Sequence, residues 1–238
     1  MIKTFFKPLF EDVKNFTLDV LFPKHCLVCN YEGQLICANC LGKLITDKKQ
    51  VCINCQRPSI LGLTHPKCMS PQSPDALMTF YNYHDPAVAK ILVAGKYYFL
   101  PEVYEILGKE IAGAITGGSK NFLANAIIVP VPLHSQRQRW RGFNQAEILA
   151  TTLTRQTGLP IKHLLKRIKP TRVQKDLSQA QRLQNIRDVF QITSPEARGK
   201  NVLLVDDVVT TGATLREAVK VLKRNGTAKV ICLAVARD

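Results

Sequence analysis

The sequence predicts an α/β protein with a doubly wound parallel sheet, preceded by a small cysteine-rich module. Apolar runs of strand length alternate with segments of helical spacing from about residue 76 onward, which is typical of a parallel sheet covered by helices. Polar loops follow two of these runs, where ligands of such sheets bind. Seven of the eight cysteines lie within the first 68 residues. We therefore expect three parts: an N-terminal helix over residues 1–22, a module over 23–70 and a larger domain over 76–238.

Size and charge restrict the class of protein. A chain of 238 residues with 46% hydrophobic residues can bury the core of one ordinary domain and a small appendage. No run of 18 apolar residues occurs, and acids stand where a signal peptide would be apolar, so we expect a cytoplasmic protein without a transmembrane segment. From His134 to Arg187, twelve lysines and arginines face two acids. Such a field favours phosphates of a small molecule or a nucleic acid, although a solvated basic face has the same composition.

Residues 1–22 carry an apolar stripe near helical spacing, with lysines between its members. A helix of this kind can lie on a membrane surface, which would place the protein peripherally at the inner face of a membrane. It can also pack against its own protein, which is the commoner outcome and the one we favour.

The cysteines of the module are spaced like metal ligands. Each of the three C-x-x-C pairs, and the H-x-x-C pair that follows them, can offer two ligands to one tetrahedral ion, so two structural zinc ions are predicted. The candidate ligands are Cys26, Cys29, Cys37, Cys40, Cys52, Cys55, His65 and Cys68. Spacing allows either sequential or crossed pairing of the four units. His65 could also be a loop histidine, which would leave three thiolates at the second site.

The larger domain begins after a proline-containing linker. A strand is predicted over Ala76–Tyr83, and helices over Asp85–Leu92 and Pro101–Ile115. Lys96 lies in the connection between these helices, where it can reach a phosphate or remain exposed. The final strand, Lys229–Val235, contains Cys232, which we interpret as a buried thiol rather than a ligand.

The most informative stretch runs from Val202 to Leu215. A continuous apolar run, Val202–Val205, predicts a strand covered on both faces, and helical spacing begins at Leu215. Asp206 and Asp207, at the carboxyl end of this strand, can accept hydrogen bonds from a sugar diol or hold Mg²⁺ through water. The turn between strand and helix offers hydroxyls, backbone N–H groups and a helix N-terminus to an anion, from Thr210, Thr211, Gly212, Ala213 and Thr214. Phosphate, diol and metal together describe a phosphorylated ribose. The same residues could instead serve only as caps of an ordinary strand–turn–helix.

This pattern resembles the phosphoribosyl pyrophosphate (PRPP) signature of type I phosphoribosyltransferases. The resemblance implies that Thr210–Thr214 bind the 5′-phosphate and that Asp206 and Asp207 bind the ribose hydroxyls. Catalysis is therefore assigned to these two acids, with Mg²⁺ accompanying PRPP.

An arginine-rich segment follows the second predicted strand, Ala126–Pro132. Arg137, Arg139 and Arg141 stand at every second position before Gly142, which predicts a loop suited to a polyanion. Its resemblance to the pyrophosphate loop of phosphoribosyltransferases implies that these arginines bind pyrophosphate, together with Lys96. Asn144 is expected to cap a helix over Gln145–Thr157. The alternative is a basic turn with Trp140 and Phe143 buried in the core.

The V-P-V-P strand and the R-G-F-N-Q segment resemble the ComF-type competence proteins, in which a cysteine module precedes the same domain. The T-x-x-Q-x-x-L-S…R-x-x-N order after Lys169 also resembles that family and places Arg182 and Asn185 on a flexible loop over the site. The one departure is His65, where the family resemblance predicts an eighth module cysteine.

Two functions follow as hypotheses. In one, PRPP binding accompanies binding of single-stranded DNA in DNA uptake, with other DNA-uptake proteins as partners; Trp140, Phe143, Tyr97 and Tyr98 are candidate stacking groups. In the other, the protein is an active phosphoribosyltransferase of nucleotide metabolism whose acceptor the sequence does not identify.

Overall fold

The structure is a computed structural model that describes residues 23–44, 46, 50–118, 123, 125–169 and 187–238. The chain divides into two compact units, residues 1–44 and 45–238, which we describe separately. The helix predicted over residues 1–22 lies outside the described residues, as do Arg182 and Asn185.

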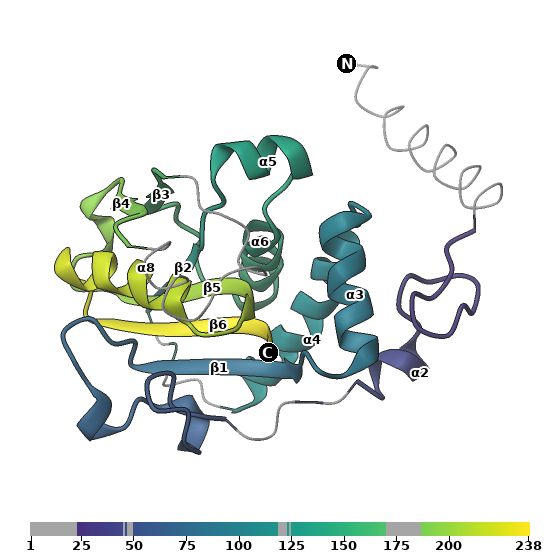
Figure 1. Ribbon diagram of the computed structural model, residues 1–238, viewed down its shortest axis with the longest axis horizontal. Helices are drawn as coiled ribbons and strands as arrows, with labels where there is room; N and C mark the ends of the chain where they lie inside the picture. Colours follow the sequence, from purple (N-terminus) through teal and green to yellow (C-terminus); the bar gives the residue numbers. More distant parts are fainter. Residues whose placement is uncertain (1–22, 45, 47–49, 119–122, 124, 170–186) are drawn as a thin grey trace. The chain divides into compact units, whose positions relative to one another are not determined.

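A four-stranded parallel sheet forms the centre of the larger unit (Figure 1). All three neighbouring pairs of strands are parallel, which confirms the predicted sheet. In spatial order the strands are β1 (Ala76–Asn82), β6 (Lys229–Arg237), β5 (Asn201–Val209) and β2 (Ala126–Pro130). Because β1 and β2 are the outer strands, the last two strands of the chain run through the middle of the sheet.

Helices cover both faces of the sheet, as an apolar strand without alternation requires. Val202 and Leu204 of β5 share a buried cluster with helix α8 (Ala213–Arg224). The intervening Leu203 and Val205 are equally buried, and successive side chains of a strand point to opposite faces. Helix α6 (Gln145–Thr157) packs against β5 and β2 and also against α4 (Glu102–Gly118), which contacts β6. The prediction that Cys232 is a buried thiol is confirmed, since it is 0% exposed and belongs to the α8 cluster.

Smaller elements complete the two units. The first unit contains α2 (Ala38–Leu41). In the second, an antiparallel pair joins β3 (Leu165–Arg167) to β4 (Phe190–Ile192). Helices α3 (Pro86–Tyr97) and α5 (Ser135–Arg141) complete its α-helices among the described residues, and its 3₁₀ turns are η1 (Ile60–Gly62), η2 (Pro66–Cys68) and η4 (Pro195–Ala197).

Two predicted elements differ from the structure in ways that matter for the site. Helix α3 continues beyond Leu92 to Tyr97, so Lys96 lies in its last turn and not in a connection. Gly95 lies inside the helix, and the ring of Tyr104 packs on its bare backbone: a Cβ there would lie 2.7 Å from Tyr104 Cε2. Strand β5 continues beyond Val205 to Val209, since Val208 and Val209 still pair with β6. Asp206 and Asp207 therefore lie inside the strand and not after it.

Candidate anion and metal sites

The two adjacent acids of β5 occupy different surroundings. Asp206 Oδ1 accepts a hydrogen bond from the N–H of Asp207 at 2.9 Å, and Asp207 Oδ1 accepts one from the N–H of Val208 at 2.7 Å. Burial, followed by the neighbouring charge of Asp207, raises the pKa of Asp206 to about 7. A carboxyl with this pKa is only partly ionised at neutral pH, so a cation or a hydroxyl donor beside it is strongly favoured.

Lys96 forms an ion pair with the second of these acids. Its Nζ lies 2.7 Å from Asp207 Oδ2, and the two side chains are 21% and 13% exposed. Burial alone would lower the pKa of Lys96, but the charges of Asp207 and Asp206 outweigh it, and the pKa is raised. The extension of α3 through Gly95 brings this ammonium group to the acids of β5.

The turn after β5 has the geometry expected for an anion site. Gly212 adopts a left-handed conformation with φ of 72°, and α8 starts at Ala213. The first N–H groups of a helix have no partner within it and lie at the positive end of its dipole. The hydroxyl of Thr211 accepts the N–H of Ala213 at 3.4 Å, a long bond. The turn can therefore offer both backbone N–H groups and threonine hydroxyls to a phosphate.

The arginine-rich segment is a helix, and the predicted loop is wrong. Helix α5 covers Ser135–Arg141; the side chain of His134 caps its N-terminus, and Gly142, with φ of 79°, ends it. Helical spacing separates the arginines, because residues four apart share a face and residues two apart do not. Arg137 and Arg141 are half-buried, whereas Arg139 is exposed. Burial, reinforced by the charge of Arg141, lowers the pKa of Arg137.

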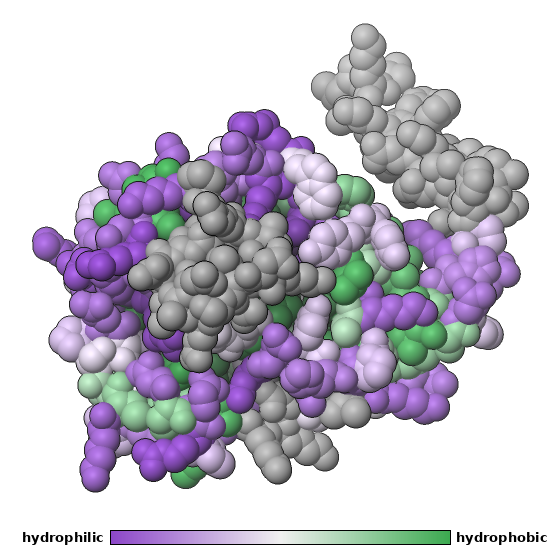
Figure 2. All heavy atoms as spheres, viewed as in Figure 1, coloured by the Kyte–Doolittle hydropathy of each residue, from purple (hydrophilic) through white to green (hydrophobic). Residues whose placement is uncertain are grey.

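Aromatic side chains lie beside this helix. Trp140 is 59% exposed, so the alternative in which it is buried in the core is wrong. Its ring meets the rings of Tyr97 and Phe99 edge-on, at centroid distances of 6.3 and 5.6 Å. Tyr98 is 70% exposed, whereas Phe143 is half-buried and tilts against Tyr104 at 6.5 Å. Figure 2 shows mainly hydrophilic side chains over α5, at the top of the view.

Two residues of the site have no counterpart in the sequence-based prediction. Arg167 of β3 is 9% exposed, and burial, followed by the charge of Arg137 and opposed by that of Asp206, lowers its pKa to about 10. Tyr104 of α4 is fully buried, and its Oη has no hydrogen-bond partner among the described residues. Burial and then the charge of Asp207 raise the pKa of Tyr104. Sequence reasoning missed these two residues because Arg167 belongs to a basic run and Tyr104 to a helix with an apolar stripe. Neither pattern shows which side chains meet in the fold.

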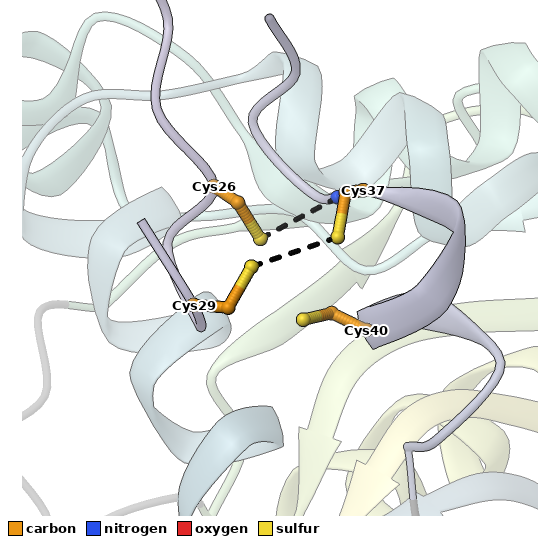
Figure 3. Close-up of side chains that lie close together, drawn as sticks. All are labelled: Cys26, Cys29, Cys37 and Cys40. Atoms are coloured by element: carbon orange, nitrogen blue, oxygen red, sulfur yellow. Dashed lines mark hydrogen bonds between the residues drawn. The ribbon is translucent and has the colours of Figure 1, made fainter. Parts of the chain in front are cut away.

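The structure gathers the module residues into two groups, in sequential order. The first group is Cys26, Cys29, Cys37 and Cys40, whose thiols point toward one another from two segments (Figure 3). The Sγ atoms of Cys29 and Cys37 are 3.7 Å apart. Four Zn–S bonds of about 2.3 Å in a tetrahedron place sulfurs about 3.8 Å apart, so the group fits zinc. Burial raises the pKa of Cys26, but hydrogen bonds from the backbone of Cys29, Cys37 and Val28 outweigh it and lower the pKa to about 6.

The second group consists of Cys52, Cys55, His65 and Cys68. His65 faces the thiols through Nδ1, which lies 3.3 Å from Cys55 Sγ. Its other nitrogen, Nε2, lies 3.1 Å from the carbonyl of Pro58. A proton on Nε2 satisfies that contact and leaves Nδ1 free to bind metal, which is the usual orientation of a zinc-bound histidine. The donor set of three thiols and one imidazole fits structural zinc.

Comparison with known proteins agrees with both parts of this architecture. Residues 141–238 match the family model of the phosphoribosyl transferase domain, and residues 17–69 match that of the double zinc ribbon domain. The chain is thus a phosphoribosyltransferase-fold protein with a double zinc ribbon.

Named relatives specify the family further. The chain is 40% identical to Competence protein F of Haemophilus influenzae over 113 residues, 46% of this chain and 49% of that protein. It is 28% identical to Competence protein ComFC of Bacillus subtilis over 204 residues, 81% and 80% of the two chains. It is 38% identical to the DNA utilization protein YhgH of Escherichia coli K12 over 104 residues, 43% and 45%. The chain is thus similar over most of its length to one ComF-type competence protein and carries both matched domains, and it spans about half the length of the other two relatives.

Two solved structures resemble part of the chain at low sequence identity. The glutamine PRPP amidotransferase of B. subtilis is 22% identical, with a TM-score of 0.40, over 59% of this chain and 30% of that one. A hypoxanthine phosphoribosyltransferase of Staphylococcus aureus is 15% identical, with a TM-score of 0.36, over 58% and 65%. In the parts of the chain that the structure describes, every helix is too short or too polar to traverse a bilayer.

Proposed function

We propose that the larger unit binds PRPP together with Mg²⁺. The observation that carries this proposal is the continuity of β5, the turn and α8: one stretch of chain presents two acids and then a helix N-terminus. In this arrangement, Thr210–Thr214 hold the 5′-phosphate, and Asp206 and Asp207 accept the two ribose hydroxyls. The geometry of the turn supports it, since the left-handed Gly212 turns the backbone directly into α8.

The pyrophosphate end is assigned to Lys96 and to two arginines of α5. Arg137 and Arg141 lie on one side of α5. The charges of Arg141 and Asp207 both influence the pKa of Tyr104, so these two residues lie near the same side chain. Lys96 is held by Asp207 in the free protein, so it lies where it can exchange that carboxylate for a phosphate oxygen. Arg139 is exposed and is better suited to the backbone of a longer polyanion than to PRPP.

When Mg²⁺ is bound with PRPP, it neutralises phosphate charge and fits the carboxylate oxygens of Asp206 and Asp207. The residues of this chain contribute position and electrostatics. Lys96, Arg137 and Arg141 would stabilise negative charge as the bond from the anomeric carbon to pyrophosphate breaks and a nucleophile attacks that carbon.

Calorimetric titration of the full chain with PRPP and Mg²⁺ tests this assignment. We expect saturable binding that is lost when Asp206→Ala and Asp207→Ala are combined. Asp188→Ala is a matched control, because Asp188 is an acid of the same unit that pairs with Lys220 on the surface. Unchanged PRPP affinity in the double variant would overturn the site assignment.

We also propose that the protein binds single-stranded DNA and acts in DNA uptake, with other DNA-uptake proteins as partners. The supporting observation is the exposed aromatic group in which Trp140 of the basic helix α5 meets Tyr97 and Phe99. Aromatic faces stack on bases of any sequence, and arginines follow the phosphate backbone.

Single-stranded DNA affinity measured across salt concentrations tests this function. Affinity should weaken as salt rises, because each neutralised phosphate releases counterions. Trp140→Ala should lower affinity, whereas Tyr31→Ala is a control, because Tyr31 is an exposed aromatic residue, 70% exposed, of the other unit. Binding that is absent at low salt, or insensitive to salt, contradicts the proposal.

The alternative is an active phosphoribosyltransferase of nucleotide metabolism. Pyrophosphate release measured with candidate acceptors separates the two: release that requires an acceptor supports transfer, and its absence beside tight PRPP binding supports a binding role.

A further inference from the structure

The second metal group lies in the same compact unit as the anion-binding turn and contacts it. Ile53, between Cys52 and Cys55, is 1% exposed and belongs to the buried cluster that contains Ala213 and Leu215. A Cβ at Gly212 would lie 2.9 Å from Ile53 Cγ1 and 3.0 Å from Ile53 Cδ1. The side chain of Ile53 therefore packs directly on the backbone of the turn.

A hydrogen bond joins the same two segments. Arg216, in the first turn of α8, donates from its NH1 nitrogen to the carbonyl oxygen of Ile53 at 3.2 Å. Burial lowers the pKa of Arg216. Arg216 lines a cavity of about 360 Å³ together with Cys68 and Asn54. A metal group of one divalent ion, three thiolates and one neutral imidazole would carry one net negative charge, which favours the half-buried cation Arg216.

The other intervening residue of the C-x-x-C pair ties it to the second ligand pair. Asn54 donates from Nδ2 to the carbonyl of Cys68 at 2.8 Å and to Ser73 Oγ at 2.9 Å. Thus Ile53 faces the anion-binding turn while Asn54 faces the segment that supplies Cys68. Metal binding joins the two ligand pairs across this junction, so it also fixes the position of Ile53.

We infer that the second metal centre is a positioning element for the anion-binding turn, acting through Ile53 and Arg216. The inference rests on the proposed function, because it names what regulates that same site. With metal bound, Ile53 and Arg216 hold Gly212 and the start of α8 in the conformation that receives a phosphate. Without metal, the short ribbon loses its main source of order, and the turn samples other conformations. Phosphate affinity then depends on zinc occupancy at a centre that never touches the phosphate.

A matched pair of isoleucines tests the inference in the full chain. Ile53→Ala removes the contact with Gly212 but keeps all ligands. Ile36→Ala is the control, since Ile36 is also buried, at 3% exposed, and also adjoins a ligand cysteine, but belongs to the other unit. The amide of Arg216 is the probe, because its N–H donates to the Gly212 carbonyl at 2.9 Å and closes the first turn of α8.

We expect Ile53→Ala to accelerate hydrogen exchange at Arg216 and to weaken PRPP affinity about tenfold, which corresponds to the competent turn falling to about one tenth of the population. Ile36→Ala should change neither quantity. Cys55→Ser combined with Cys68→Ser should reproduce the Ile53→Ala effects with one zinc ion lost per chain by elemental analysis.

Unchanged exchange at Arg216 in both Ile53→Ala and the cysteine variant, with zinc lost from the latter, would overturn the inference. The same experiments distinguish failure of this inference from failure of the proposed PRPP binding. If the wild-type chain does not bind PRPP, the exchange of Arg216 still reports whether the metal centre positions the turn.

Discussion

Replacement of Asp206 by asparagine is expected to stabilise the free protein above neutral pH. The pKa of Asp206 is raised from 3.8 to about 7, mainly by burial and then by the charge of Asp207. An acid with a raised folded-state pKa binds a proton in the folded protein at pH values where the unfolded chain has lost it. Stability therefore falls as pH rises from about 4 to about 7, and the full cost is present above pH 7.

The magnitude follows from the same pKa shift. A shift of about three units corresponds to about 4 kcal/mol of unfolding free energy at pH 8, and linkage reduces this to about 2 kcal/mol at pH 5. Asparagine cannot ionise, and its oxygen can still accept the N–H of Asp207. Its side-chain NH₂ group, which aspartate lacks, needs a hydrogen-bond acceptor in the buried site, and this requirement costs about 1–2 kcal/mol of unfolding free energy at any pH. The net gain at pH 8 is about 2 kcal/mol.

Urea unfolding between pH 5 and pH 8, with zinc present, measures this effect. Fluorescence of Trp140, the single tryptophan, reports on the larger unit. The free-energy difference between Asp206→Asn and wild type should increase by about 2–3 kcal/mol from pH 5 to pH 8. Taking this difference cancels the protonation of the zinc-binding thiols, which both proteins share.

The control acid, Asp188, has a pKa that is shifted in the opposite direction. Lys220 lowers the pKa of Asp188, so Asp188 stabilises the fold above its ordinary pKa and loses that effect only as pH falls toward its lowered folded value. The difference for Asp188→Asn should therefore be flat between pH 5 and pH 8. A flat difference for Asp206→Asn, or one that grows toward low pH, would refute the reasoning.

Three further predictions concern other contacts. Lys96→Met should lower PRPP affinity by about tenfold or more and destabilise the fold by about 3 kcal/mol in urea unfolding, because it leaves Asp207 without its ion-pair partner; equal stability would contradict the ion pair. Gly95→Ala should lower the melting temperature, since its Cβ would meet the Tyr104 ring at 2.7 Å; a matched Gly113→Ala, where nothing lies within 4 Å, should not. His65→Ala should weaken zinc binding at the second group, so that a chelator removes one of the two ions at a lower concentration than from wild type; unchanged resistance to chelator would contradict ligation by His65.

Elements with a strong local signal could be predicted from the sequence. Asn144 accepts the N–H of Ala146 and begins a helix at Gln145 that ends at Thr157, as expected from its capping chemistry and periodicity. The run Val202–Val205 is fully buried, because a strand without alternation has no solvent-facing side. Both depend on neighbours within a few residues.

The arginine segment shows where such local arguments end. Arginines at alternate positions suggested an extended loop, but the tryptophan and arginine residues are compatible with a helix, and His134 and Gly142 supply its two ends. The helix places Arg137 and Arg141 together and directs Arg139 to solvent. A spacing of two residues has a different meaning in each backbone conformation, and the local sequence does not choose between them.

The amino-acid sequence by itself determined the chemistry available to this protein: two sets of candidate metal ligands, two adjacent acids, a hydroxyl-rich turn before a helix and a basic segment. Only the tertiary structure decided which of these groups meet. It paired Lys96 with Asp207, placed Tyr104 and Arg167 beside the acids, and set Ile53 of the second metal group on Gly212. These contacts join residues far apart in the chain, so they depend on how helices and strands pack, and periodicity within a segment carries no information about them.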